Sequence, residues 1–133
     1  MGKGAYQHLR KYGRMKIVWI GAGNVATHLS QAFAEAGHTT LQVYSRTMES
    51  AQTLANMLGC KATTCAEEID DTADVYILSV KDAVIGDLVM HALPRCSNAL
   101  FLHTAGSIPI SVFRPYVDHY GVLYPMQTFS KEH

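Results

Sequence analysis

A short apolar run that turns directly into a helical pattern through two glycines constrains the fold of this chain more than any other feature. The run is KIVWI at 16–20, the turn is GAG, and the segment that follows at 24–37, NVATHLSQAFAEAG, places apolar residues three and four positions apart. An uninterrupted apolar strand is typical of a parallel sheet covered on both faces, and the helical period predicts a helix packed on that sheet. Gly37 is expected to end this helix, because glycine readily takes the left-handed conformation.

The same alternation of short strands and longer helices continues along the chain. Thr47 is expected to cap the next helix at its N-terminus and Gly59 to end it. The further predicted strands span 40–44, 61–64, 74–80, 98–104 and 120–126, and the further predicted helices span 48–59, 83–93 and 108–116. Such alternation predicts an α/β fold with a doubly wound, mostly parallel sheet of the Rossmann type, occupying residues 15–133.

Charge is unevenly distributed along the chain. The 133 residues carry no net formal charge, yet residues 1–16 hold five basic side chains and no acidic one. A nucleic-acid-binding domain is expected to carry its positive charge on the folded body, so the mildly acidic remainder argues against that class. Residues 1–14 are interpreted as a basic leader, or as a misassigned start before a natural first residue at Met15. No segment is apolar enough to span a bilayer or to act as a secretory signal, which predicts a cytoplasmic protein with no membrane partner.

Cysteine and histidine spacing gives no support to a metal site. The three cysteines, Cys60, Cys65 and Cys96, form no CxxC pair, and the seven histidines form no HxxxH or HExxH arrangement. We therefore expect reduced structural cysteines and no bound metal.

The glycine turn matches a sequence motif that is typical of dinucleotide-binding domains. Gly21 would make the tight turn, Gly23 would let the backbone approach a pyrophosphate, and Ala26 would take the third small position, where helix and strand pack together. Backbone amides at the start of the helix would then face the diphosphate. The alternative is a strand-to-helix connection that needs glycine for geometry alone. The predicted diphosphate-binding residues are Gly21, Ala22, Gly23, Asn24, Val25 and Ala26.

The end of the second predicted strand bears on which cofactor is bound. NAD-binding and FAD-binding domains are expected to carry an Asp or Glu about 20 residues beyond the glycines, where it binds the ribose hydroxyls. Here the sequence is VYSRT, with Ser45, Arg46 and Thr47 at that place. A guanidinium flanked by hydroxyls suits a 2′-phosphate, so NADP is predicted over NAD. The acid would also be expected in an S-adenosylmethionine methyltransferase. Alternatively, Arg46 is a solvated loop residue and Thr47 only a helix cap.

Later strand ends supply the remaining candidates. Small and hydroxyl-bearing residues there would lie against the nicotinamide: Ser79, Val80, Thr104, Ala105, Gly106 and Ser107. Lys81 and His103 are candidate proton donors for a reduced substrate. The alternatives are a surface position for Lys81 and a core position for His103. Tyr124 and Gln127 are further candidates for a substrate pocket.

Five segments in order carry a family resemblance: IGAGNVATHL, VYSRT, ADVYILSVKD, HTAGSIPI and GVLYPMQTFSK. Over about 16–131, they resemble bacterial Rossmann-like NADP oxidoreductases that carry a helical C-terminal domain of unknown function. More distantly, the chain is similar to pyrroline-5-carboxylate reductase, deazaflavin-dependent NADP oxidoreductases and β-hydroxyacid dehydrogenases.

The resemblance implies an NADP-dependent reductase or dehydrogenase that acts as a homodimer through its second domain and holds a small-molecule substrate between domains. The expected reaction is hydride transfer between nicotinamide C4 and a carbonyl or imine carbon. This chain ends at His133, before the helical domain would begin, so its expected part is the cofactor domain. The alternative is a sensor or scaffold domain that binds NADP without turnover.

Overall fold

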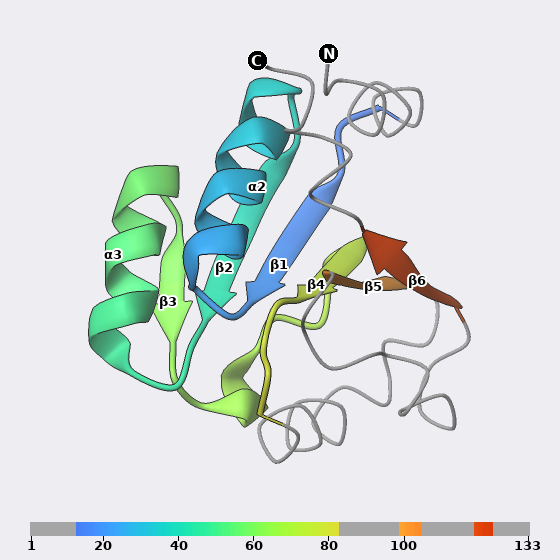
Figure 1. Ribbon diagram of the computed structural model, residues 1–133. Coiled ribbons are helices and arrows are strands. Elements are labelled where there is room, and N and C mark those ends of the chain that lie inside the picture. The colour runs from blue at the N-terminus through green and yellow to red at the C-terminus, as the bar shows by residue number, and fades with distance from the viewer. Residues whose placement is uncertain (1–12, 83–98, 105–118, 124–133) are drawn as a thin grey trace.

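The computed structural model describes residues 13–82, 99–104 and 119–123. Six strands within these residues form one sheet (Figure 1). Every pair of neighbouring strands is parallel, and their order is β3-β2-β1-β4-β5-β6. The strands are β1 (Lys16–Ile20), β2 (Thr39–Tyr44), β3 (Lys61–Thr63), β4 (Val75–Leu78), β5 (Leu100–Thr104) and β6 (His119–Leu123). The predicted α/β fold with a parallel sheet is confirmed. The predicted helices at 83–93 and 108–116 lie outside the described residues, as does most of the basic leader.

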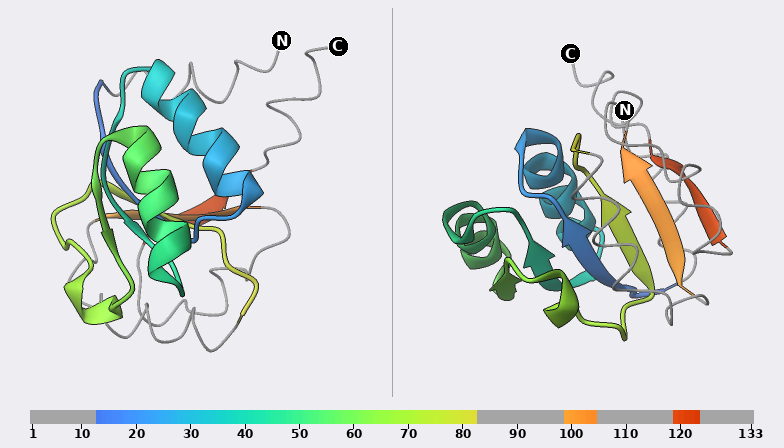
Figure 2. Two further views of the ribbon diagram at one scale, coloured as in Figure 1. Left: turned by 90° about the vertical axis from the view of Figure 1, so that its left-hand side faces the viewer. Right: turned by 90° about the horizontal axis from the view of Figure 1, so that it is seen from below.

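Two helices cover one face of the sheet (Figure 2). Helix α2 (Asn24–Glu35) connects β1 to β2, and helix α3 (Met48–Leu58) connects β2 to β3. Both end within about one turn of a glycine in the left-handed conformation, Gly37 with φ of 101° and Gly59 with φ of 72°. The predicted cap of α3 is confirmed, since Thr47 Oγ1 accepts a hydrogen bond from the Ser50 amide at 3.3 Å.

Alternate residues of the central strand enter two separate hydrophobic layers. Ile17 and Trp19 face α2 and α3, where the Trp19 ring meets Phe33 edge-on at 5.7 Å. Val18 and Ile20 face the opposite layer, which includes a short 3-10 helix, η1 (Ala66–Glu68), that the sequence does not predict. All four residues of β1 in these layers are fully buried. This burial on both faces is the reason for the uninterrupted apolar run, because successive side chains of a strand point to opposite faces.

The strand order reverses between β1 and β4. From β1 the chain adds β2 and then β3 on one side, and it then crosses to add β4, β5 and β6 on the other. All six carboxyl ends lie at one edge of the sheet, which is where open parallel sheets bind ligands. Hydrogen bonds continue past the strand ends there, from the Gly21 amide to the Tyr44 carbonyl at 2.7 Å and from the Ser79 amide to the Ile20 carbonyl at 2.8 Å.

Among the described residues, no helix combines the length and apolar character needed to cross a membrane.

Candidate functional site

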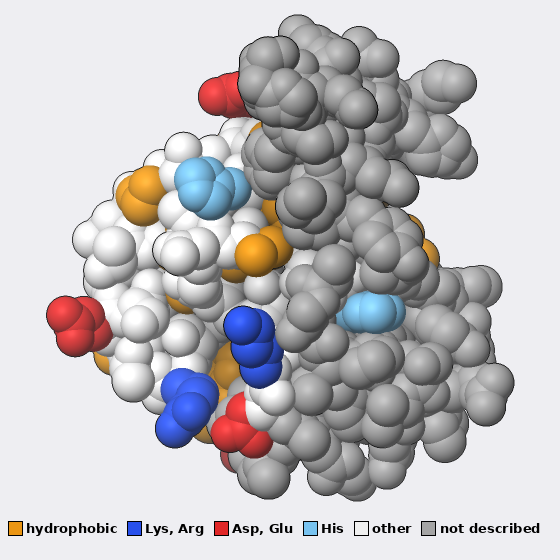
Figure 3. Space-filling model, viewed as in Figure 1, with side chains coloured by type: hydrophobic (Ala, Val, Ile, Leu, Met, Phe, Trp, Pro, Cys, Tyr) orange, Lys and Arg blue, Asp and Glu red, His pale blue; other side chains and the backbone are white. Residues whose placement is uncertain are grey.

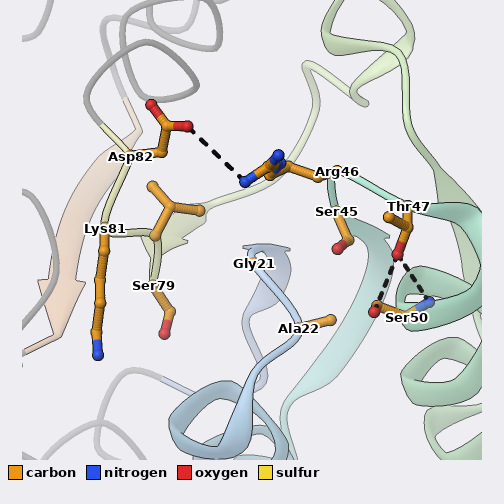
Figure 4. A pocket seen from close by; sticks show the side chains of 10 residues that line it. Gly21, Ala22, Ser45, Arg46, Thr47, Ser50, Ser79, Lys81 and Asp82 are labelled. Carbon is orange, nitrogen blue, oxygen red and sulfur yellow. Dashed lines mark hydrogen bonds and ion pairs between the residues drawn. The ribbon is translucent and has the colours of Figure 1, made fainter.

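A pocket of about 380 Å³ opens at the carboxyl ends of β1, β2 and β4, beside the point where the strand order reverses (Figure 4). Three chain segments and the first turn of α3 contribute its walls. The lining residues are Gly21, Ala22, Ser45, Arg46, Thr47, Ser50, Ser79, Val80, Lys81 and Asp82. Eight of the ten belong to the set predicted from the sequence, and Ser50 and Asp82 do not.

Gly21 is required by both backbone conformation and close packing. Its φ is 113°, which side chains rarely allow. A Cβ built on Gly21 would lie 2.9 Å from the Ser79 carbonyl carbon, closer still to the carbonyl oxygen, and 3.2 Å from Cγ1 of Val80. The turn after β1 therefore passes directly against the end of β4, and this contact forms the floor of the pocket.

No side chain caps the N-terminus of α2. Its N-cap is Gly23, which has no side chain to cap the helix, and its first turn contains no acidic residue. A Cβ on Gly23 would meet nothing within 4 Å, so the backbone is open to an approaching group. Gly23, Asn24 and Val25 do not line the pocket, but they follow Ala22 directly. Ala26 is fully buried between helix and sheet, in the packing position predicted for it.

Polar side chains gather at the end of β2. Ser45 is buried, and its amide donates to the Thr63 carbonyl at 3.2 Å. Thr47 caps α3, and its hydroxyl also donates to Ser50 Oγ at 3.0 Å. Arg46 is 69% exposed and extends over the pocket towards Asp82 (Figure 4). The sequence could have indicated Ser50, because the third residue after an N-cap commonly exchanges hydrogen bonds with the capping residue.

The surface around this edge mixes charges of both signs. In Figure 3, basic and acidic side chains lie close together near the lower edge of the described surface, beyond the strand ends. One such contact is the ion pair between Arg46 Nη1 and Asp82 Oδ2 at 3.9 Å. It joins the loop after β2 to the loop after β4, a pairing that no local sequence pattern indicates.

The wall after β4 is connected to β5. Thr104 Oγ1 donates to Ser79 Oγ at 3.4 Å. Ser79 and Lys81 point in the same direction in Figure 4, with Lys81 directed away from Arg46. Lys81 is exposed and lines the pocket, so the structure places one of the two predicted proton donors at the site.

His103 does not line this pocket. It pairs with Leu78 in the sheet and lies two residues after Phe101, which places it on the face opposite α2 and α3. Burial lowers the pKa of His103 below its ordinary value, and the adjacent Thr104 backbone partly opposes this effect. The remaining predicted residues, Ala105, Gly106, Ser107, Tyr124 and Gln127, lie outside the described part of the chain.

The described cysteines are reduced, with Cys60 partly buried and Cys65 exposed, while Cys96 lies outside the described residues. Burial raises the pKa of the Cys60 thiol to about 11. Within residues 13–82, 99–104 and 119–123, no three potential metal ligands come together.

A parallel sheet ordered β3-β2-β1-β4-β5-β6, with a glycine turn at the reversal of strand order, defines a Rossmann-type dinucleotide-binding domain. Residues 16–100 match the model of the family "NADP oxidoreductase coenzyme F420-dependent". The chain belongs to this family, and the predicted family resemblance is confirmed.

Solved structures agree with this assignment. A Bacteroides fragilis protein assigned as an NADP oxidoreductase has 45% sequence identity and a TM-score of 0.76, covering 88% of this chain and 46% of that one. Shikimate dehydrogenase from Aquifex aeolicus has 17% identity and a TM-score of 0.67, covering 91% and 48%. An imine reductase from Myxococcus stipitatus in complex with NADP+ has 23% identity and a TM-score of 0.63, covering 79% and 39%. The latter two support the fold alone.

This chain spans less than half the length of each of these three structures. No curated protein sequence matches it.

Proposed function

We propose that this chain supplies the dinucleotide-binding part of an oxidoreductase that prefers NADP(H). The observation that carries the preference is Arg46, held between the hydroxyl-bearing Ser45 and Thr47 at the wall of the pocket. The loop after β2 contains no carboxylate between Ser45 and Met48 that could accept hydrogen bonds from an unmodified ribose. Membership of an NADP oxidoreductase family supports the same choice.

Each part of the site has a role in this proposal. The open first turn of α2, from Gly23, binds the diphosphate through backbone amides and the helix dipole. Arg46 offers a planar, charged fork to a 2′-phosphate, and neighbouring hydroxyls add neutral donors. The nicotinamide supplies hydride chemistry when bound. Ser79 and Thr104, joined by their hydroxyls, orient the ring at the ends of β4 and β5.

We propose a small carbonyl or imine compound as the substrate. The Lys81 side chain, which lines the pocket, would donate a proton from Nζ to the reduced oxygen or nitrogen. The position of His103 on the opposite sheet face does not favour it in this role. We further propose that the complete protein carries the helical second domain, forms a homodimer through it, and completes the substrate site between domains.

A non-catalytic NADP-binding sensor is the second candidate function. The observation that favours it is the exposure of Lys81, because a solvated ammonium lacks the pre-organised contacts of a catalytic proton donor. Single-turnover oxidation of bound NADPH by small ketones and cyclic imines distinguishes the two. A stable complex that turns over none of them, in the presence of the second domain, would favour the sensor.

Titration of the chain with NADPH, NADH and S-adenosylmethionine, followed by calorimetry, tests the cofactor assignment. The Arg46→Ala variant should weaken NADPH binding by about tenfold and leave NADH affinity within about twofold. The expected loss is modest because Arg46 is largely exposed, so its hydrogen bonds to a charged phosphate contribute a free energy at the lower end of the range for such bonds. The matched control is Arg14→Ala, which removes an exposed arginine that donates to the Gly37 carbonyl at the other end of α2.

A second variant tests diphosphate recognition separately. Gly23→Ala adds a methyl group in open space at an ordinary φ of −81°, so folding should be unaffected. The methyl group should weaken NADPH and NADH to the same extent, since both carry the diphosphate. Equal affinity of the unmodified chain for NADH and NADPH would refute the role given to Arg46, and tight binding of S-adenosylmethionine alone would refute the whole assignment.

A further inference from the structure

Arg46 already has an acidic partner on the opposite side of the pocket. The guanidinium extends from the loop after β2, the Asp82 carboxylate extends from the segment after β4, and Nη1 and Oδ2 are 3.9 Å apart (Figure 4). Both residues line the pocket, and their side chains are 69% and 43% exposed. The ion pair therefore lies across the region where a ligand must reach Arg46.

We propose that Asp82 is a specificity-determining residue that reduces the preference of this pocket for 2′-phosphorylated cofactor by competing for Arg46. This inference rests on the proposed function. A 2′-phosphate carries nearly two negative charges near neutral pH, so it must displace the carboxylate from the guanidinium and then lie near it. A 2′-hydroxyl carries no charge and can donate a hydrogen bond to a carboxylate. Asp82 thus opposes NADPH and does not oppose NADH.

The position of Asp82 distinguishes this pair from an ordinary surface ion pair. The loops after β2 and β4 are separated by β1 in the sheet, and both line this pocket. Any group that fills the pocket beside Arg46 changes the surroundings of both charges. Dinucleotide-binding domains for NAD place a carboxylate at the end of the second strand. In this proposal, Asp82, in the segment after β4, brings a carboxylate to the same pocket beside an arginine.

The test is the Asp82→Asn variant, which keeps the size of the side chain and removes its charge. NADPH should bind about three- to tenfold more tightly. Loss of the exposed Arg46–Asp82 ion pair and relief of the screened repulsion between carboxylate and phosphate should each change the affinity by a few fold at most. NADH affinity should stay unchanged or fall slightly. The gain for NADPH should be largest at low ionic strength and shrink as salt is added.

Two control variants isolate the position of the charge. Asp82→Glu keeps the carboxylate and should keep the selectivity of the unmodified chain. Glu35→Gln removes one exposed negative charge at the far end of α2 and should leave both affinities unchanged. If Glu35→Gln tightens NADPH as much as Asp82→Asn does, net charge alone is responsible and the proposal is wrong.

The double variant separates this proposal from the assignment on which it rests. Combined with Arg46→Ala, the Asp82→Asn change should tighten NADPH clearly less than it does in the unmodified chain, because the competition requires the guanidinium and only the screened repulsion remains. A full gain in that background would overturn the competition. If Arg46→Ala weakens NADPH but Asp82→Asn leaves it unchanged or weaker, the role of Asp82 is overturned and the cofactor assignment stands. If Arg46→Ala has no effect on NADPH, the proposed function itself fails.

Discussion

Replacing Gly21 with alanine tests the geometry that brings the ends of β1 and β4 together. Alanine at a φ of 113° costs about 1 to 3 kcal/mol in backbone strain. The new Cβ would also lie 2.9 Å from the Ser79 carbonyl carbon, and the backbone there is held by the hydrogen bond from the Ser79 amide to the Ile20 carbonyl, so it cannot move aside cheaply. Forced overpacking of this kind costs about 1 to 3 kcal/mol more.

We therefore expect Gly21→Ala to lower the free energy of unfolding by about 2 to 6 kcal/mol, a large fraction of the roughly 5 to 15 kcal/mol of a typical domain. Urea unfolding followed by tryptophan fluorescence measures it. Trp19, the single tryptophan, is fully buried two residues before the substituted glycine. A change in midpoint without a change in slope would show that stability alone has changed.

The matched control is Gly37→Ala. Gly37 has a similar φ of 101°, but a Cβ there meets nothing within 4 Å. It should therefore cost only the backbone strain, about 1 to 3 kcal/mol. If Gly21→Ala costs no more than Gly37→Ala, the close approach of Ser79 is not a constraint and the reasoning about the pocket floor is refuted.

Three further outcomes are expected. Phe33→Ala, which empties a buried site against Trp19, should cost about 3 to 5 kcal/mol by the same urea assay; a loss under 1 kcal/mol would contradict the packing seen. Thr47→Ala removes the cap of α3 and should cost about 1 kcal/mol, whereas Thr47→Ser, which keeps the hydroxyl, should cost much less. Because burial lowers the pKa of His103, its protonation favours the unfolded chain, and stability should fall as pH drops below about 6.5. His103→Gln should flatten this dependence in unfolding curves measured above and below that pH, and an unchanged slope would contradict the burial effect.

Local spacing was sufficient to predict the elements around the glycine turn. The apolar run of β1, the helical period of α2 and the Thr47 cap are each set by residues within one or two turns of one another. Within residues 13–82, the predicted ends differ from the observed ones by up to two residues, as in β4, which ends at Leu78 where the prediction continues to 80. Strand ends are the least determined by pattern, because pairing with neighbours decides where a ladder stops.

Contacts between distant segments could not be predicted in the same way. The short helix η1 is held by Gln42, whose side-chain amide donates to the Glu68 carbonyl at 3.1 Å and whose side-chain oxygen accepts from the Asp70 amide at 2.7 Å. These partners are more than twenty residues away from Gln42 in the sequence, and no periodicity marks them. Lys81 and His103 are both predicted as proton donors at strand ends, but only the tertiary structure separates them. Lys81 lies in the loop after β4 and lines the pocket, whereas His103 lies in β5 on the sheet face opposite α2 and α3.

The glycine fingerprint and the basic loop after β2 identify a dinucleotide-binding unit from the sequence alone, because each is a local requirement of backbone conformation or charge. Whether they act on one ligand depends on strand order, which brings β1, β2 and β4 to one edge of the sheet. That order also places Asp82 opposite Arg46, thirty-six positions earlier in the chain. A carboxylate so far along the chain reaches the pocket beside Arg46 only because parallel strands end side by side.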